Sequence, residues 1–170
     1  MESAQETISD LEAQLARLRQ ELEEKTAEAE ALHRVSTAIA ESDDMDQMLR
    51  VVAEVAVSIT GTEACFIYLY DEPRGELVMR AAYGVDPSVV GKLRLRASEG
   101  LTGWVAREKK PLAIPEAAWK DHRFKYFPEL REERYQSFLS APIVAKGHTL
   151  GVINVRTVQP HHYTPRQIHL

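Results

Sequence analysis

The strongest constraint on the fold is a heptad stripe of apolar residues in the N-terminal region. Apolar side chains recur at alternating steps of three and four residues, and Lys25 and Ser36 interrupt the series. This spacing is typical of one long helix whose a and d positions form a narrow apolar seam. Because so narrow a stripe does not stabilise an isolated helix, we expect the helix to pack against a partner. The predicted seam consists of Ile8, Leu11, Leu15, Leu18, Leu22, Ala29, Leu32 and Ile39.

Two kinds of partner satisfy such a seam. In the first interpretation, two copies of the chain form a parallel homodimeric coiled coil through the seam. In the second, a single amphipathic helix folds back on its own domain. We favour the homodimer, because the heptad pattern is sustained over more than four heptads. Lys25 within the seam costs stability but can set the register of the coil or keep it marginal enough to switch. The flanking charges, such as Glu12, Arg19 and Glu21, do not decide between parallel and antiparallel helices.

The composition changes sharply between Ser36 and Asp44. Before this point the chain is dominated by Ala, Glu, Leu, Gln and Arg, and aromatic residues appear only after it. We therefore divide the chain into an N-terminal coiled-coil helix over residues 1–44 and a domain over residues 45–170. A chain of 170 residues with 44% hydrophobic side chains is long enough for one domain with a substantial core.

The second part alternates helical and strand patterns in a fixed order. Apolar residues at helical spacing predict a helix from Met45 to Ile59, with Asp43 or Asp44 as its cap and Gly61 as its end. Two hairpins and a short helix follow, and Thr164 caps a terminal helix. This order predicts an α+β domain, an antiparallel β-sheet with helices packed on one face. The predicted strands are 64–70, 77–83, 92–97, 112–114, 137–145 and 149–157, and the short helix is 101–108.

Charge, hydropathy and cysteine content exclude several classes of protein. The formal net charge is -5 and at most two cations are adjacent, so we expect no direct nucleic-acid binding. No apolar run reaches the roughly 18 to 20 residues that span a bilayer, so we expect no membrane segment. The single cysteine, Cys65, excludes an internal disulfide and fits a cytoplasmic location.

Three stretches in a fixed order resemble the GAF domain family, the small-molecule and light-sensing modules of signalling proteins. They are "ACFIYLYDEPRGELVMRAAYG", "EGLTGWVAREKKPLAIPEAAWKDHRF" and "SFLSAPIVAKGHTLGVINV", and the resemblance runs from about Asp46 to Leu170. It implies a GAF/PAS-like fold in which "GLTGWV" crosses from a strand into a short helix beside a ligand chamber. Trp104 on that helix is then either a core residue or a ligand contact.

Residues 115–136 are the most informative about a ligand. This segment gathers aromatic side chains among cations, which suits a planar or anionic small molecule, although a long loop also needs aromatic residues to attach itself to the domain. Cyclic-nucleotide-binding GAF domains carry a longer pattern on the last strand, of which this sequence keeps only Asn154 and an aromatic residue, Tyr163. The candidate ligand-binding residues are Trp104, Trp119, His122, Phe124, Phe127, Tyr135 and Asn154.

The sequence contains no recognisable catalytic or metal-binding motif. It has no phosphate-binding glycine loop, no His-Glu zinc motif and no nucleophile elbow, so we expect no enzymatic activity. The histidines lack metal-ligand spacing, so we expect no metal site. Haem occurs in some GAF domains, and His122 or His148 would then be its axial ligand. Cys65 lies within a predicted strand, which argues against covalent bilin attachment. The cofactor is left unknown.

The sequence therefore predicts a cytoplasmic GAF-type sensory and regulatory domain of a signal-transduction protein. We expect it to homodimerise through its coiled coil and to couple small-molecule binding to a downstream output domain beyond Leu170. The alternative is a dimerisation module without a ligand, and a less favoured one is a haem-binding gas or redox sensor. The identity of the ligand and of the output domain stays open.

Overall fold

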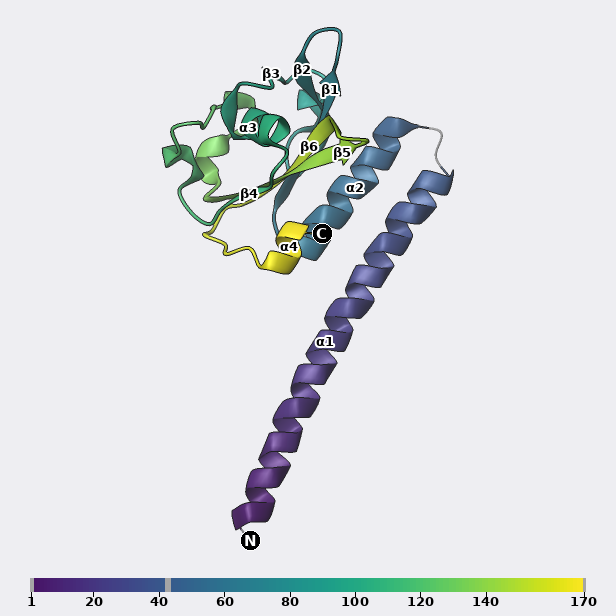
Figure 1. Cartoon of the computed structure of the whole chain (residues 1–170), viewed down its shortest axis with the longest axis vertical. Helices are drawn as coiled ribbons and strands as arrows, with labels where there is room; N and C mark the ends of the chain where they lie inside the picture. The colour runs from purple at the N-terminus through teal and green to yellow at the C-terminus, as the bar shows by residue number, and fades with distance from the viewer. Residues whose placement is uncertain (1, 42–43, 170) are drawn as a thin grey trace.

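The computed structural model describes residues 2–41 and 44–169 (Figure 1). Two helices lead into a sheet, and short helices and 3-10 turns connect its strands. The helices are α1 (Glu2–Glu41), α2 (Met45–Thr60), α3 (Gly100–Glu108) and α4 (Pro165–His169). The strands are β1 (Ala64–Asp71), β2 (Glu76–Tyr83), β3 (Arg94–Arg96), β4 (Leu112–Ile114), β5 (Ser137–Ala145) and β6 (His148–Thr157).

The strands form one antiparallel sheet of six strands in the order β3-β2-β1-β6-β5-β4. All of the predicted strands are present, so the predicted α+β class is confirmed. Strand β3 is shorter than the predicted 92–97, because Lys92 belongs to the preceding turn and donates its N–H to the Val89 carbonyl at 3.1 Å. The two long hairpins meet at β1 and β6, which form the centre of the sheet.

Alternation along the central strands creates two different faces. On β6, Val152 packs on the side of α3, whereas Ile153 and Val155 pack on the side of α2. Helix α2 buries Leu49 and Ala53 against the second of these faces. The longer domain helix α2 and the terminal helix α4 thus share one face, whereas the short α3 and residues 115–136 cover the other. The prediction that the helices pack on one face therefore holds for α2 and α4 and is wrong for α3.

The ends of α2 follow the predicted capping residues. The Asp44 carboxylate accepts a hydrogen bond from the Asp46 N–H at 2.9 Å. Gly61 has a φ of 65° and donates its N–H to the Val57 carbonyl at 2.9 Å. Asp43, the other predicted cap, lies outside the described residues. Local cap chemistry therefore fixes where α2 begins and ends.

Helix α1 is continuous from Glu2 to Glu41, and its C-terminal half lies antiparallel beside α2 while its N-terminal half projects away from the domain (Figure 1). Ala31 is buried on the side that faces α2, and Val35 and Ala38 are partly buried. These residues occupy c and g positions of the predicted heptads. The predicted division at residues 44 and 45 lies between the two helices, and the independence of the two parts stays a prediction. The seam remains exposed at Ile8, Leu11, Leu15, Leu18, Leu22, Leu32 and Ile39, by 49% to 67%.

Candidate functional site

The face of the sheet below α3 is the floor of the candidate ligand chamber. Phe66 on β1 and Phe138 on β5 are both buried in this floor. Gly100 begins α3 with a φ of 69°, which disfavours any residue with a side chain. Gly103 has a different role, because a Cβ there would lie 2.7 Å from the Arg96 carbonyl oxygen. The two glycines of "GLTGWV" therefore allow α3 to begin at this point and to lie flush against the end of β3.

Residues 115–136 form the outer wall of the chamber through three short 3-10 turns. Leu130 and Tyr135 are buried at 1% and 2% exposure, and Phe127 packs against the same cluster. Arg131, between the second and third turns, has a φ of 48°. The segment is thus attached to the sheet by a few inserted side chains and otherwise bonded mainly to itself.

The structure brings only some of the predicted ligand-binding residues together. Trp104, Phe127 and Tyr135 pack against one core cluster, and Phe124 packs in a neighbouring cluster with Leu101 and Phe138. Asn154 is fully buried in the floor. Trp119 is 39% exposed and the His122 side chain is 90% exposed, so both lie on the outer surface of the segment. A ligand-binding role for each of these residues stays a prediction.

Two charged contacts connect the 115–136 segment with α3. The Arg123 guanidinium lies 4.7 Å from the centroid of the Trp104 ring and also binds the Asp121 carboxylate. The hydrogen bonds from Arg123 lower the pKa of Asp121 to about 2. Lys125 donates to Glu99 at 2.8 Å, just before α3 begins. The cations of this segment therefore have intramolecular partners at this edge of the chamber.

Asn154 connects β6, β5 and α3 within the core. Ser140 donates its hydroxyl to the Asn154 side-chain oxygen at 2.5 Å, and the Asn154 amide donates to the Thr102 hydroxyl at 3.0 Å. All three side chains are buried. Because the buried amide is paired on both sides, Asn154 fixes the position of α3 on the sheet in this conformation.

A buried ion pair between Arg156 and Glu132 joins β6 to the 115–136 segment. Arg156 projects from β6 with a side chain 6% exposed, and Glu132 reaches inward from the 115–136 segment with a side chain fully buried. Sequence analysis missed both residues. The alternation of Val152, Asn154 and Arg156 on one face of β6 could have identified the arginine, whereas Glu132 lies in an irregular segment with no periodicity.

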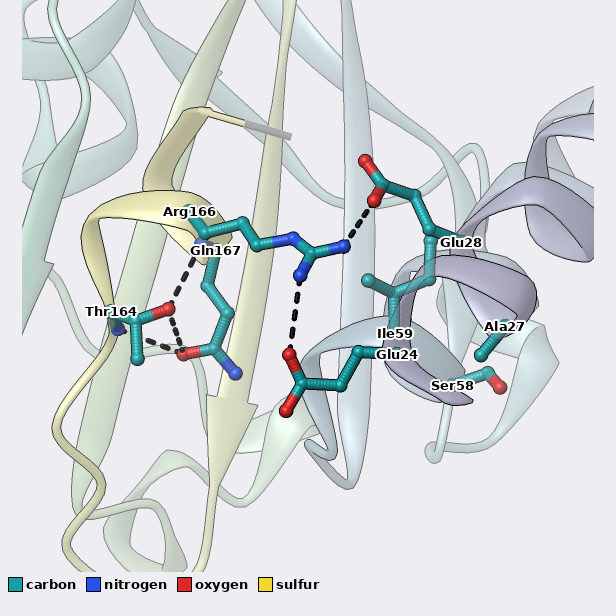
Figure 2. Close-up of a pocket in the computed structure, with 8 residues that line it drawn as sticks. All are labelled: Glu24, Ala27, Glu28, Ser58, Ile59, Thr164, Arg166 and Gln167. Carbon is teal, nitrogen blue, oxygen red and sulfur yellow. Dashed lines mark hydrogen bonds and ion pairs between the residues drawn. The ribbon is translucent and has the colours of Figure 1, made fainter. Parts of the chain in front are cut away.

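A second polar site lies on the opposite face, where α4 meets α1 (Figure 2). Arg166 donates to Glu24 at 3.2 Å and also to Glu28, one turn further along α1. These contacts, together with Lys25, lower the pKa of Glu28. Thr164 and Gln167 cap α4 reciprocally, since the Thr164 N–H donates to the Gln167 side chain at 2.9 Å and the Gln167 N–H donates to the Thr164 hydroxyl at 3.2 Å.

Gln167 extends this contact to α2, because its side-chain amide donates to the Thr60 carbonyl at 3.1 Å. Next to it, an apolar cavity of about 280 Å³ lies between α1, α2, α4 and the sheet, and its lining includes Val35, Ile59 and Ile153. Helix α4 is therefore in contact with both leading helices.

The remaining features that bear on function are metal-binding groups, His148, membrane-spanning helices and Cys65. Among residues 2–41 and 44–169, no group of three or more His, Cys, Asp and Glu side chains could hold a metal ion. His148, the other predicted axial haem ligand, is exposed at the start of β6. In that same part of the chain, no helix combines the length and apolar character needed to cross a membrane. Burial raises the pKa of the Cys65 thiol, which lies on the α2 face of the sheet.

An antiparallel six-stranded sheet with a long helix on one face and a short helix and an irregular segment on the other defines a domain of the α+β class. The chain belongs to the GAF domain family, whose model matches residues 42–170. This result confirms the resemblance found in the sequence.

Several of the proteins that this chain resembles are phosphotransferase proteins. The chain is 28% identical over 115 residues to the phosphoenolpyruvate-dependent phosphotransferase system protein of Escherichia coli, a match that covers 68% of this chain and 15% of the relative. The GAF domain of a Coxiella burnetii phosphoenolpyruvate-protein phosphotransferase has a TM-score of 0.75 at 29% identity, covering 83% of each chain. The corresponding Acinetobacter domain has a TM-score of 0.71 at 27% identity, covering 82% of each chain.

Proposed function

We propose that this chain is a cytoplasmic sensory and regulatory GAF domain, without enzymatic activity, that homodimerises through α1. In this proposal a small molecule binds in the chamber between α3, the 115–136 segment and the sheet, and α4 and α1 pass the change to a downstream output domain. The relationship to the GAF regions of phosphotransferase proteins supports a regulatory role. Cys65, a buried free thiol, is compatible with a reducing compartment.

The observation that carries the proposal is that α1 has two separate faces. One face packs on α2 through Ala31 and binds Arg166 through Glu24 and Glu28. The other face is the leucine seam, in which Leu18 and Leu22 are 64% and 67% exposed. Leu32 belongs to the seam and also lines the cavity beside α2, whereas the seam residues from Ile8 to Leu22 lie outside that contact. Helix α1 can therefore hold its own domain through its C-terminal half and pair with a second copy through its N-terminal half.

The contacts of α4 support coupling between the chamber and α1. Ser137 at the start of β5 is hydrogen-bonded to Thr157 at 2.6 Å and to the Tyr163 hydroxyl at 2.7 Å. Tyr163 directly precedes Thr164, the cap of α4, and Arg166 on α4 binds α1. A rearrangement of the 115–136 segment, which leads into β5, therefore has a short path to α1.

The alternative is a dimerisation module without a ligand. One observation favours it: the chamber is filled by the protein's own side chains, including Phe127, Tyr135 and the Glu132–Arg156 pair. Under this alternative the 115–136 segment keeps its position on the sheet under all conditions, and the only function of the chain is to form the dimer.

Sedimentation velocity of the full chain over a range of concentrations tests dimerisation. We expect a dimer at high micromolar concentration, and we expect the double variant Leu18→Asp/Leu22→Asp to be monomeric, because charges at d and a positions cannot be buried in a seam. The matched control Ala13→Asp/Gln20→Asp places two negative charges at outer f positions and keeps the dimer. A monomeric wild-type chain would contradict the proposal.

Coupling requires a second measurement. Compounds that raise the melting temperature in a screen of neutral and anionic metabolites are added to the dimer, and the distance between spin labels on the two α1 helices is measured. A changed distance supports coupling. An unchanged distance with a bound compound rejects it, and the absence of any binding compound favours the module without a ligand.

A further inference from the structure

The Arg156–Glu132 ion pair joins the central strand β6 to the irregular 115–136 segment. Arg156 lies on the central strand β6, paired with Ala64 on β1 and with Phe138 on β5. Glu132 lies in a 3-10 turn whose backbone hydrogen bonds span only three residues, such as the Tyr135 N–H to the Glu132 carbonyl at 3.1 Å. The cation is therefore fixed by the sheet, while its anion belongs to an irregular segment held by short-range backbone hydrogen bonds and a few buried side chains.

The surroundings of Arg156 resemble a receptor for a carboxylate. Its guanidinium lies 5.0 Å from the ring centroid of Phe66, 5.2 Å from that of Phe138 and 5.9 Å from that of Tyr135. Glu132 accepts one hydrogen bond from Arg156 and another, at 2.7 Å, from the Phe127 N–H. A planar anion held between a guanidinium, a backbone amide and aromatic rings is how proteins commonly bind a small carboxylate.

The ion pair with Glu132 leaves one hydrogen-bond donor of Arg156 without a partner among the described residues. This donor is the buried Nε atom. A planar carboxylate that accepts from two guanidinium nitrogens at once would pair this atom as well. Breaking a buried ion pair is costly because it leaves a buried charge without a partner, but exchange of one carboxylate for another keeps Arg156 paired and avoids that cost.

We propose that Glu132 is an internal occupant of an anion site, and that the chamber takes a small-molecule carboxylate which displaces Glu132 from Arg156. This inference rests on the proposed function, since it names the ligand class of the proposed chamber. Displacement moves the Glu132 turn outward, and it breaks the hydrogen bond from the Phe127 N–H. The ligand's apolar part then packs on the rings of Phe66 and Phe138.

The test is an NMR titration of the full chain with sodium propionate, which reproduces the Glu132 side chain, and with benzoate, which adds a planar ring. Propionamide and inorganic phosphate at equal ionic strength are the matched neutral and non-carboxylate probes. We expect the carboxylates to shift the Arg156 Nε–H and Phe127 N–H signals, and the neutral and phosphate probes to leave them unchanged. Equal shifts from phosphate would overturn the assignment to carboxylates.

Variants test the displacement itself. Glu132→Gln removes the carboxylate that competes with the ligand for Arg156. We therefore expect this variant to bind benzoate at least tenfold more tightly than the wild type. Glu129→Gln, an exposed glutamate of the same segment, is the matched control and leaves the affinity unchanged. Equal affinity of Glu132→Gln and wild type, or no shift in either, overturns the proposal.

A stability measurement covers the case in which the variants fold poorly. Glu132→Ala leaves Arg156 buried without its partner, so its melting temperature falls. Propionate is expected to restore part of that loss and propionamide none, and equal effects of the two contradict the proposal. These signals are local to the chamber and independent of dimerisation. A negative result therefore removes the carboxylate site alone, whereas the sedimentation experiment and the metabolite screen decide the proposed function separately.

Discussion

The Asp121 carboxylate accepts three hydrogen bonds from Arg123. The Arg123 N–H and Nε donate to one oxygen at 2.9 Å each, and Nη2 donates to the other at 2.7 Å. The two side chains are 18% and 25% exposed. This pair fixes the turn at the start of the 115–136 segment and holds Arg123 over Trp104. Among the contacts of this segment, we expect this ion pair to show the clearest loss of stabilisation at low pH.

Because the pKa of Asp121 is lowered to about 2 in the folded protein, its ionised form stabilises the fold above its ordinary pKa. That stabilisation is lost as the pH falls from about 4 through 2. We therefore expect Asp121→Asn to lower the free energy of unfolding by on the order of 1 to 2 kcal/mol at pH 6, and the gap from wild type to shrink below about pH 4. Urea unfolding at several pH values measures this gap.

Glu129→Gln is the control for the Asp121 prediction, because it removes an exposed carboxylate from the same segment. It should leave the free energy of unfolding nearly unchanged at each pH. A gap between Asp121→Asn and wild type that stays constant down to pH 3 would show that the carboxylate charge does not stabilise the turn.

At the level of elements, the position of α3 depends on the close approach at Gly103. An added Cβ would lie 2.7 Å from the Arg96 carbonyl oxygen and 3.0 Å from the Ala97 carbonyl carbon, both rigid backbone atoms. Gly103→Ala therefore forces α3 away from β3 and is expected to cost about 1 to 3 kcal/mol of unfolding free energy despite the better helix propensity of alanine. Arg107→Ala, on the exposed side of α3, should cost under about 0.5 kcal/mol. Equal losses in thermal or urea unfolding would contradict this account.

A second prediction at this level concerns Arg166, which connects α4 to α1. Its side chain is 38% exposed, and Glu24 and Glu28 are 52% and 25% exposed. Such an ion pair contributes little to global stability, so Arg166→Gln should change the free energy of unfolding by less than about 1 kcal/mol. The local effect should be larger: hydrogen exchange of the α1 amides around Glu24 and Glu28 should become severalfold faster.

The control for Arg166 is Arg17→Gln, which removes an ion pair with Glu21 within α1 at 3.4 Å and leaves α4 untouched. Its effect on exchange near Glu28 should be negligible. Since the pKa of Glu28 is lowered by Arg166, the wild-type protection should also weaken as the pH falls through that lowered value. Unchanged exchange in Arg166→Gln would remove the α4 contact from the proposed coupling path.

Elements whose signals are local could be predicted from the sequence, and contacts between distant segments could not. Asp44 and Gly61 mark the ends of α2 through hydrogen bonds within a few residues, and alternation in β6 assigns each side chain to a face. The heptads predicted the extent of α1, but its contact with α2 runs through Ala31, which the apolar seam does not include. Ala31, Val35 and Ala38 do recur at helical spacing, but the sequence of α1 does not tell which element they pack against.

The candidate site shows the same division. Aromatic residues of the 115–136 segment were identified by composition, and Phe127 and Tyr135 do enter the core. Composition cannot tell which residues of an irregular segment face inward, so His122, exposed on the surface, was selected and Glu132 was not. The inward direction of Glu132 is set by the turn at Arg131 and by a partner on β6, 24 positions away in the sequence.

At the scale of the whole molecule, the proposed dimer has two possible helix orientations. In a parallel, in-register coil, Lys25 of one copy meets Lys25 of the other, and both polar side chains share one layer of the seam. In an antiparallel coil with full overlap, Lys25 would instead lie against leucine residues. Grouping the two lysines confines the polar atoms to one layer of the seam. The long side chain of each Lys25 extends to solvent, where hydration and the ion pair with Glu28 limit the repulsion between the two cations. The parallel orientation is therefore expected.

Disulfide formation distinguishes the two orientations. Leu15→Cys places a thiol at an a position, where the two copies of residue 15 face each other within disulfide reach only in a parallel, in-register coil. The native Cys65 is fully buried, so it contributes no background cross-linking. We expect mild oxidation of Leu15→Cys to give a covalent dimer on non-reducing gels, while Ala13→Cys, at an outward f position, stays monomeric on the same gel. In an antiparallel coil residue 15 lies opposite residue 32, so cross-linking of Leu15→Cys only when mixed with Leu32→Cys would establish that orientation instead.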